Sequence, residues 1–410
     1  MPNDLANSPD AMLRARARQV IPGGLWGHLN AANLPDGYPQ FFVSAEGCRL
    51  RDADGREFVD FMCGWGPMVL GYRNPVVEEA ARRQAAQGDA MNGPAPVLVE
   101  LAETLVGMIP HADWCLFQKN GTDATTACVT IARAGTGRRK VLVARGSYHG
   151  AAPWCTPSLA GVTAEDRAHL LHFDYNDAAS LQAAADQAKG DLAAVIVTAF
   201  RHDMGRDLEL PDPAFARAAR EICDATGAAL ILDDVRAGFR LDLGGSWEGI
   251  GVRPDLAAYS KAIANGHALA AVTGAERFRD GATRIYTTGS FWCAAVSMAA
   301  AVATLSELRR LDGPAHMRAM GQRFRVGLEA LAARHGVGIR QSGPAQMPLV
   351  LFEDDADTRK GNAFCAAALR AGAYFHPRHN MFLSCAHQPA DIDLALQAAD
   401  VGLAAVARMG

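Results

Sequence analysis

Lys261 is the residue of this chain whose side-chain amine is best placed to react with a carbonyl group. It follows the apolar run LAAYS and is flanked by small residues in SKAIANG, so its amine is sterically free. The other lysines stand at positions 119, 140, 189 and 360. A lysine amine that bonds to an aldehyde forms an imine, which a substrate amine can displace. An ordinary surface lysine is the alternative, and Lys119 is the main competitor for the reactive role.

An anion site and a buried acid accompany this lysine. Gly121 and Thr122 lie in KNGTDAT, after the apolar run WCLFQ and before a helical pattern. Free amide groups at a helix N-terminus and a hydroxyl bind phosphate groups, although plain N-capping by Asn120 or Thr122 is the alternative. Asp233 ends the apolar run AALIL, where an unpaired carboxylate is costly to bury. Capping of a neighbouring helix or an ion pair with Arg236 would also explain it.

Taken together, these features predict a site for pyridoxal 5′-phosphate (PLP). PLP needs an amine for its aldehyde, an anion site for its phosphate, and a carboxylate that keeps its pyridine nitrogen protonated. Tyr148 in RGSYHG follows the strand-like run KVLVA and could stack on a flat ring; a packing tyrosine is the alternative. His149 could orient the site, but a hydrogen-bonded turn histidine is the favoured interpretation.

The residues named above must be positioned by a sheet, because each of them lies next to a run typical of a buried strand. From about residue 75 to 280, short apolar runs alternate with helical patterns, as in AAVIVTA, a helix capped by Asp212-Pro213, and AALILDD. This alternation predicts an α/β fold with a mostly parallel central sheet and helices on both faces. Ligands bind beyond the carboxyl ends of the strands in such sheets.

Three segments are expected along the chain. Residues 1–55, with a predicted hairpin turn at DADG, join the smaller domain. Residues 56–300 form the large PLP-binding domain. Residues 301–410 form a smaller α+β domain that ends on a long helix from about Asp391.

Composition excludes several classes of protein. The chain has 410 residues and a formal net charge of −4, which argues against nucleic acid as a partner. It has no 18-residue apolar run and no apolar leader segment, so neither a membrane span nor a secretory signal is expected. Its nine cysteines include no CxxC pair, which favours reduced thiols in the cytoplasm and no metal site.

The order of the motifs resembles the class III PLP-dependent aminotransferases, most closely the branch of glutamate-1-semialdehyde 2,1-aminomutase. The similarity covers nearly the whole chain, through IPGG, DADGREFVDFMCGWGPMVLG, NGTDAT, GSYHG, ICDATGAALILDDVRAGFR, YSKAIANG and AHQPADIDLAL. It implies a PLP-dependent transferase of fold type I that works as a homodimer. The active site is then shared between the subunits.

The resemblance also implies roles for individual residues. Lys261 forms the Schiff base with PLP and moves the proton, while Asp233 pairs with the pyridine nitrogen. Gly121 and Thr122 bind the phosphate, Tyr148 stacks on the ring, Trp65 lines the substrate pocket, and Ser290 reaches the phosphate of the other subunit. The implied reaction is a ping-pong transfer from an amino donor to a keto or aldehyde acceptor. An aminomutase or epimerase would use the same residues, and a non-catalytic binding protein is a further alternative.

Departures from the family pattern concern the substrate. Asn30 stands where the aminomutase has an arginine for the substrate carboxylate, which makes glutamate-1-semialdehyde doubtful as the substrate. Asp203 falls near the place where relatives have Asn or Gln beside the phenolic oxygen of PLP. Phe291 and Trp292 follow Ser290 and indicate a more aromatic pocket.

An arginine that could bind a substrate carboxylate is sought in the smaller domain. Arg378 in AYFHPRHNMF is the first candidate, with a surface ion pair as the alternative. Arg201 and Arg236 are weaker candidates.

Overall fold

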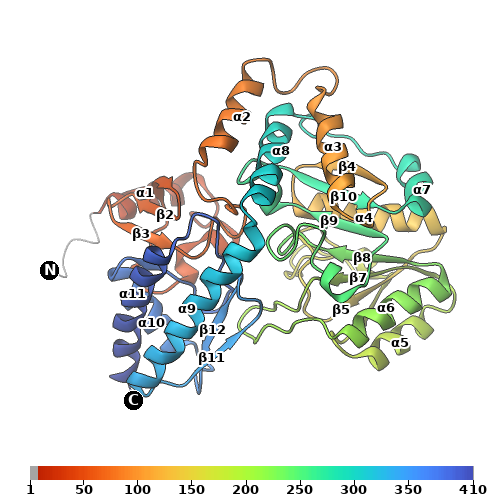
Figure 1. Ribbon diagram of the computed structural model, residues 1–410. Helices are drawn as coiled ribbons and strands as arrows, with labels where there is room; N and C mark the ends of the chain where they lie inside the picture. The colour runs from red at the N-terminus through yellow and green to blue at the C-terminus, as the bar shows by residue number, and fades with distance from the viewer. Residues whose placement is uncertain (1–7, 410) are drawn as a thin grey trace.

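The computed structural model describes residues 8–409, in which a seven-stranded sheet forms the centre of the large domain (Figure 1). The strand order is β4 (Trp114–Gln118), β10 (Ala270–Gly274), β9 (Leu256–Tyr259), β8 (Ala229–Asp233), β7 (Leu192–Thr198), β5 (Lys140–Ala144) and β6 (Leu170–Phe173). Only β10 is antiparallel to its neighbours in this sheet, and the other pairs are parallel. The expectation of a mostly parallel sheet is therefore confirmed.

Helices cover both faces of this sheet because successive residues of a strand point to opposite sides. Ile231 of β8 packs in the cluster that includes α4 (Gly121–Thr136), whereas Leu230 and Leu232 pack in the cluster that includes α6 (Pro213–Thr226). The expected start and end of α6 are present: Asp212 accepts from Ala214 N, and Gly227 follows in the left-handed region at φ +70°. The remaining helices of this part are α2 (Pro75–Ala85), α3 (Val97–Met108), α5 (Ala178–Gln187), α7 (Arg279–Arg284) and α8 (Ala295–Arg310).

The smaller domain is built from both ends of the described chain, which lie side by side in Figure 1. A four-stranded sheet joins β1 (Phe42–Glu46), β2 (Arg49–Asp52) and β3 (Glu57–Asp60) to β13 (Ala373–Tyr374). The other elements are α1 (Pro9–Val20), α9 (Gly313–His335), α10 (Arg359–Arg370), α11 (Pro389–Ala407) and the hairpin of β11 (Ile339–Ser342) with β12 (Leu349–Phe352).

The parallel pairing of β3 with β13 agrees with an N-terminal segment that joins the smaller domain. The proposed boundary at 55 falls in the turn between β2 and β3, and the one at 300 falls inside α8. These boundaries stay a prediction, and residues 1–7 of the first segment lie outside the described residues.

The carboxyl ends of β4, β8 and β9 meet at one edge of the sheet, because these strands run in the same direction. Helix α4 begins directly after β4, Asp233 ends β8, and Lys261 follows β9. The topology therefore brings together the three features that the sequence singled out. Within residues 8–409, no helix is both long and apolar enough to span a membrane.

Candidate active site

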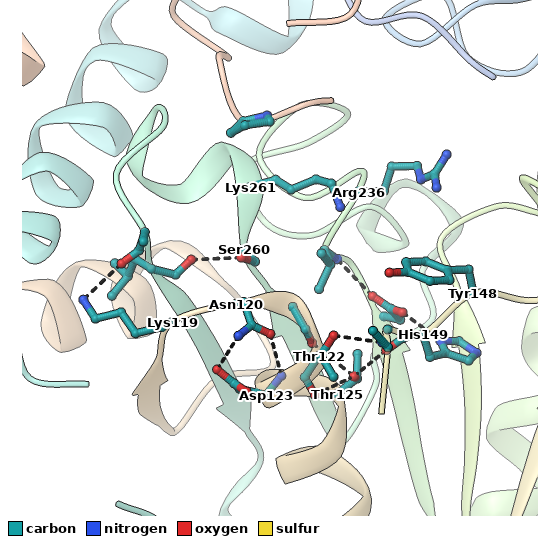
Figure 2. A pocket seen from close by; sticks show the side chains of 18 of the residues that line it. Lys119, Asn120, Thr122, Asp123, Thr125, Tyr148, His149, Arg236, Ser260 and Lys261 are labelled. Carbon is teal, nitrogen blue, oxygen red and sulfur yellow. Dashed lines mark hydrogen bonds and ion pairs between the residues drawn. The ribbon is translucent and has the colours of Figure 1, made fainter. Parts of the chain in front are cut away.

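A cavity of about 690 Å³ opens at this edge of the sheet (Figure 2). Its size is typical of pockets that hold a cofactor or a small substrate. Its lining includes the first turn of α4, the segment from Tyr148 to Ala152, and the three side chains of Asp233, Arg236 and Lys261. The cavity is thus formed by the residues from which chemistry was expected.

Lys261 carries a free amine into the cavity. Within the described chain, its Nζ makes no hydrogen bond or ion pair, and its backbone holds the left-handed conformation at φ +45°. Burial, followed by the positive charge of Arg236, lowers the pKa of the amine to about 8. A larger fraction of the amine is therefore unprotonated, and hence nucleophilic, near neutral pH than for an exposed lysine.

Lys119 also lies against the cavity, but its amine is engaged. Its Nζ donates to the carbonyl of Ala268 at 3.0 Å and to the hydroxyl of Ser297 at 3.3 Å. Partial burial lowers the pKa of this amine. The geometry therefore favours Lys261 over Lys119 as the lysine that bonds to a carbonyl group.

Asp233 is held by His149 at the base of the cavity. The distance from Asp233 Oδ2 to His149 Nδ1 is 2.7 Å, and Asp233 Oδ1 accepts from the amide of Val235 at 3.2 Å. Both side chains are buried, and His149 stacks on Trp154 with a centroid separation of 6.3 Å. Of the two interpretations of His149, the structure supports the one in which it orients the site. No ion pair joins Asp233 to Arg236 among residues 8–409.

The N-terminus of α4 faces the same cavity. Asn120 caps the helix by accepting from Asp123 N at 3.1 Å, so the capping alternative is present. The amides of Gly121 and Thr122 nevertheless have no acceptor among the described residues, and both residues line the cavity. A Cβ at Gly121 would lie 2.6 Å from Val235 Cγ1, which explains the glycine. These free amide groups can bind an anion.

Three further residues predicted from the sequence differ in where they lie relative to the cavity. Tyr148 lines the cavity, and burial raises the pKa of its hydroxyl. Trp65 is not part of the lining of the cavity, and it lies in edge contact with the rings of His28, His376 and His379. Ser290 is exposed and lies outside the lining of the cavity in its own chain.

Two residues proposed for the substrate or cofactor lie elsewhere. Asp203 lies in a separate hollow of about 480 Å³, where its carboxylate accepts from Arg201 Nε at 2.9 Å. Its neighbour His202 lines the cavity instead, and burial lowers the pKa of the His202 imidazole. Arg378 is exposed and does not line the cavity. The structure thus does not bring Asp203 or Arg378 to Lys261.

Two residues that line the cavity were not expected to be important. The sequence made Arg236 only a weak candidate and did not point to His202. The signal for Arg236 was its position three residues after Asp233, at the carboxyl end of a buried strand. His202 lies in the loop after β7, the next strand of the sheet, where the same rule applies.

The donors and acceptors of the cavity fit PLP. A phosphate would meet the free amides of α4, a pyridine nitrogen would meet the Asp233 carboxylate, and an aldehyde would meet the free amine of Lys261. The orphaned amides and the unpartnered amine are polar groups that PLP would satisfy.

The comparisons with known proteins agree with this fit. The family model for class-III aminotransferases matches residues 33–389. The aminopentol aminotransferase of Sphingopyxis macrogoltabida is 49% identical over 396 residues, which covers 97% of this chain and 94% of that protein. The glutamate-1-semialdehyde 2,1-aminomutase of Chloroherpeton thalassium is 30% identical, with 95% and 96% coverage.

A solved structure gives the same result. The PLP internal aldimine form of the Sphingopyxis sp. MTA144 FumI protein superimposes with a TM-score of 0.96 at 48% sequence identity, and the match covers 98% of this chain and 97% of that one. Fold, cavity and similarity therefore agree on fold type I and on PLP as the cofactor. The chain belongs to the class III aminotransferases and is a PLP-dependent transaminase.

Proposed function

We propose that this transaminase uses Lys261 to bond to PLP and to move a proton, in a ping-pong transfer from an amino donor to a keto or aldehyde acceptor. The observation that supports this assignment is the free amine of Lys261, in one cavity with the Asp233–His149 pair and the N-terminus of α4. When bound, PLP supplies an aldehyde that takes the amino group and a ring that withdraws electrons from the substrate Cα.

Each of the other residues has a defined task in this proposal. Asp233 holds a proton at the pyridine nitrogen, and His149 fixes the orientation of the carboxylate through the 2.7 Å contact. Gly121 and Thr122 bind the phosphate through their free amides, and Tyr148 covers the ring. With PLP bound, Lys261 would move the proton between the substrate Cα and C4′ of PLP. Its lowered pKa favours this role, because a general base works best when its pKa lies near the ambient pH.

We also propose a homodimer in which Ser290 reaches the phosphate site of the partner subunit. Ser290 is exposed, and its neighbours Tyr286 and Phe291 are 93% and 66% exposed. Covering large exposed aromatic side chains with a second protein surface is energetically favourable. Sedimentation of the wild type and of Phe291→Asp tests the dimer, and an unchanged molar mass in the variant would argue against this contact.

The substrate is proposed to be a primary amine like that named for the aminopentol aminotransferase, which is 49% identical to this chain. The aminomutase branch is disfavoured by Asn30, whose side-chain amide donates to the Leu25 carbonyl at 2.8 Å and whose oxygen accepts from Ala32 N at 3.0 Å. Asn30 therefore stabilises its own loop and does not offer a charge to a substrate carboxylate. Conversion of glutamate-1-semialdehyde without a second substrate would contradict this proposal.

A reducing compartment such as the cytoplasm fits this proposal. All nine cysteines, which lie between positions 48 and 385, are free thiols. Disulfides are rare in such compartments.

The assignment of Lys261 is tested by reducing the PLP-loaded protein with borohydride and mapping the modified peptide by mass spectrometry. The label is expected on Lys261. Lys261→Ala should lose both the label and turnover, whereas the matched control Lys119→Ala should keep the label. A label on Lys119 in the wild type would overturn the assignment.

A further inference from the structure

Arg236 is a half-buried cation that makes no direct ion pair with an acidic residue among residues 8–409. Its Nη1 donates to Asn380 Oδ1 at 2.6 Å and lies 2.9 Å from His379 Nε2. Among the ion pairs of residues 8–409, none includes Arg236. Burial lowers the pKa of its guanidinium to about 10, although the negative charge of Asp233 acts in the opposite direction, so the group is still charged at neutral pH. A charge that is largely removed from water and makes no direct ion pair is costly, and an anion bound beside it would offset that cost.

The imidazoles around Arg236 do not compensate for its charge. His379 Nδ1 lies 2.6 Å from the carbonyl of Asn380, so Nδ1 carries the proton and Nε2 accepts from Arg236. Burial lowers the pKa values of His379 and His202 well below the ordinary value, and the charge of Arg236 adds to the effect. These side chains hold the guanidinium in place without neutralising it.

Arg240, four residues further along, uses its guanidinium differently from Arg236. Arg240 is fully buried, and its Nη1 and Nη2 donate to the backbone carbonyls of Leu383 and Gly66, so only its Nε has no partner among the described residues. Arg236 lines the cavity, and neither its Nε nor its Nη2 has a partner in the described chain. The free edge of this guanidinium is therefore available to a ligand.

The free edge lies near the reacting lysine and away from the phosphate site. Figure 2 shows Arg236 and Tyr148 to one side of Lys261, whereas Asn120 and Thr122 lie below it. The charge of Arg236 also affects the pKa values of both Lys261 and Tyr148, in agreement with this proximity. An anion at Arg236 would thus be part of a substrate that reacts at Lys261 and not the phosphate of PLP.

We propose that Arg236 binds the carboxylate of an α-amino acid or α-keto acid that serves as the second substrate. The inference rests on the proposed function, since a transaminase must accept two substrates in one cavity. A planar guanidinium offers two parallel donors to a carboxylate, and Asn380 and His379 hold its remaining nitrogen. An amine without a carboxylate makes no such contact with Arg236. Arg236 should therefore contribute only to the half-reaction of the substrate that carries a carboxylate.

The test uses the PLP-loaded wild type, Arg236→Gln and Arg236→Lys, with circular dichroism as a check of folding. Each half-reaction is followed alone by cofactor absorbance, with L-alanine as the carboxylate donor and n-hexylamine as the carboxylate-free donor. The ratio of kcat/KM for alanine to that for hexylamine should fall about 100-fold in Arg236→Gln, the loss expected for a charge-assisted bidentate pair. Arg236→Lys, which keeps the charge without the fork, should fall less.

Propionate, which has the carboxylate but no amino group, gives a readout of binding alone. Its dissociation constant, measured by calorimetry, should rise at least about 10-fold in Arg236→Gln. Arg378→Gln is the matched control, because Arg378 is exposed and outside the cavity; it should leave both the ratio and the propionate affinity unchanged.

Three outcomes would overturn the inference: an equal loss of both half-reactions in Arg236→Gln, an unchanged propionate affinity in that variant, or a shifted ratio in Arg378→Gln. Failure of the proposed function looks different. In that case the wild type would convert neither donor, while the propionate measurement would still report on Arg236.

Discussion

Replacing Asp233 by Asn should leave the fold intact and slow catalysis strongly. The substitution preserves the size of the side chain and can keep an oxygen near His149 Nδ1, now 2.7 Å from Asp233 Oδ2. It removes the negative charge that would hold a proton at the pyridine nitrogen of PLP. Without that proton, the ring withdraws electrons poorly from the substrate Cα.

The magnitude follows from the effect of one adjacent charge on a proton equilibrium. An opposite charge in direct contact shifts a pKa by about 1–3 units, and each unit corresponds to about 1.4 kcal/mol. Burial of Asp233 and its contact with His149 favour the upper part of this range. We therefore expect a loss of about 100- to 1000-fold in the rate of the half-reaction, the equivalent of two to three pKa units.

The assay is a single-turnover measurement of cofactor absorbance with saturating amino donor, at several pH values. The matched control is Asp234→Asn, because Asp234 is also buried but accepts from the backbone and hydroxyl of Ser246 outside the cavity. The control should lower thermal stability with little effect on the cofactor spectrum. A rate for Asp233→Asn within threefold of the wild type would refute the role of the carboxylate.

Two further predictions concern the lysine and the phosphate site. The pKa of about 8 for Lys261 predicts that PLP binds to the apoprotein faster as pH rises from about 6.5 to 8, because the amine loses its proton, and that the rate then levels off. Stopped-flow absorbance measures this rate, and a rate that keeps rising with the same slope above about pH 9 would contradict the lowered pKa. Gly121→Ala should weaken PLP binding in equilibrium dialysis and lower stability by about 1–3 kcal/mol, because its Cβ would lie 2.6 Å from Val235 Cγ1. Gly107→Ala in α3, where nothing lies within 4 Å of the added Cβ, is the control that should leave PLP binding unchanged and should not lower stability, because alanine favours a helix more than glycine does.

Strand ends were the most useful signal in the sequence. Apolar runs identified β4, β5, β7, β8 and β9, and the carboxyl ends of β8 and β9 are where Asp233 and Lys261 lie. Edge strand β6 and helix α5 were not predicted. Both are partly exposed, with mixed burial along their length, so their periodicity is weak.

The choice among similar side chains could not be made from sequence. Asp203 and His202 are neighbours in one loop, yet His202 alone enters the cavity. Arg236 is fixed by Asn380, which is 144 residues away in the chain, while Arg378 nearby stays exposed. These outcomes depend on the packing of the two domains against each other, which local patterns do not report.

The smaller domain contains residues from both ends of the chain, so it can be completed only late in synthesis. The hydroxyl of Tyr38 donates at 2.7 Å to the carbonyl of Phe375, 337 residues further along, and β3 pairs with β13. At typical elongation rates of about 5–20 residues per second, tens of seconds separate these partners on the ribosome. The strands of the large domain are all made within that interval, so its sheet can form first. The early strands β1–β3 can meanwhile form only a small sheet, in which the edge of β3 that later pairs with β13 is still open, so this part of the nascent chain is expected to need protection by a chaperone.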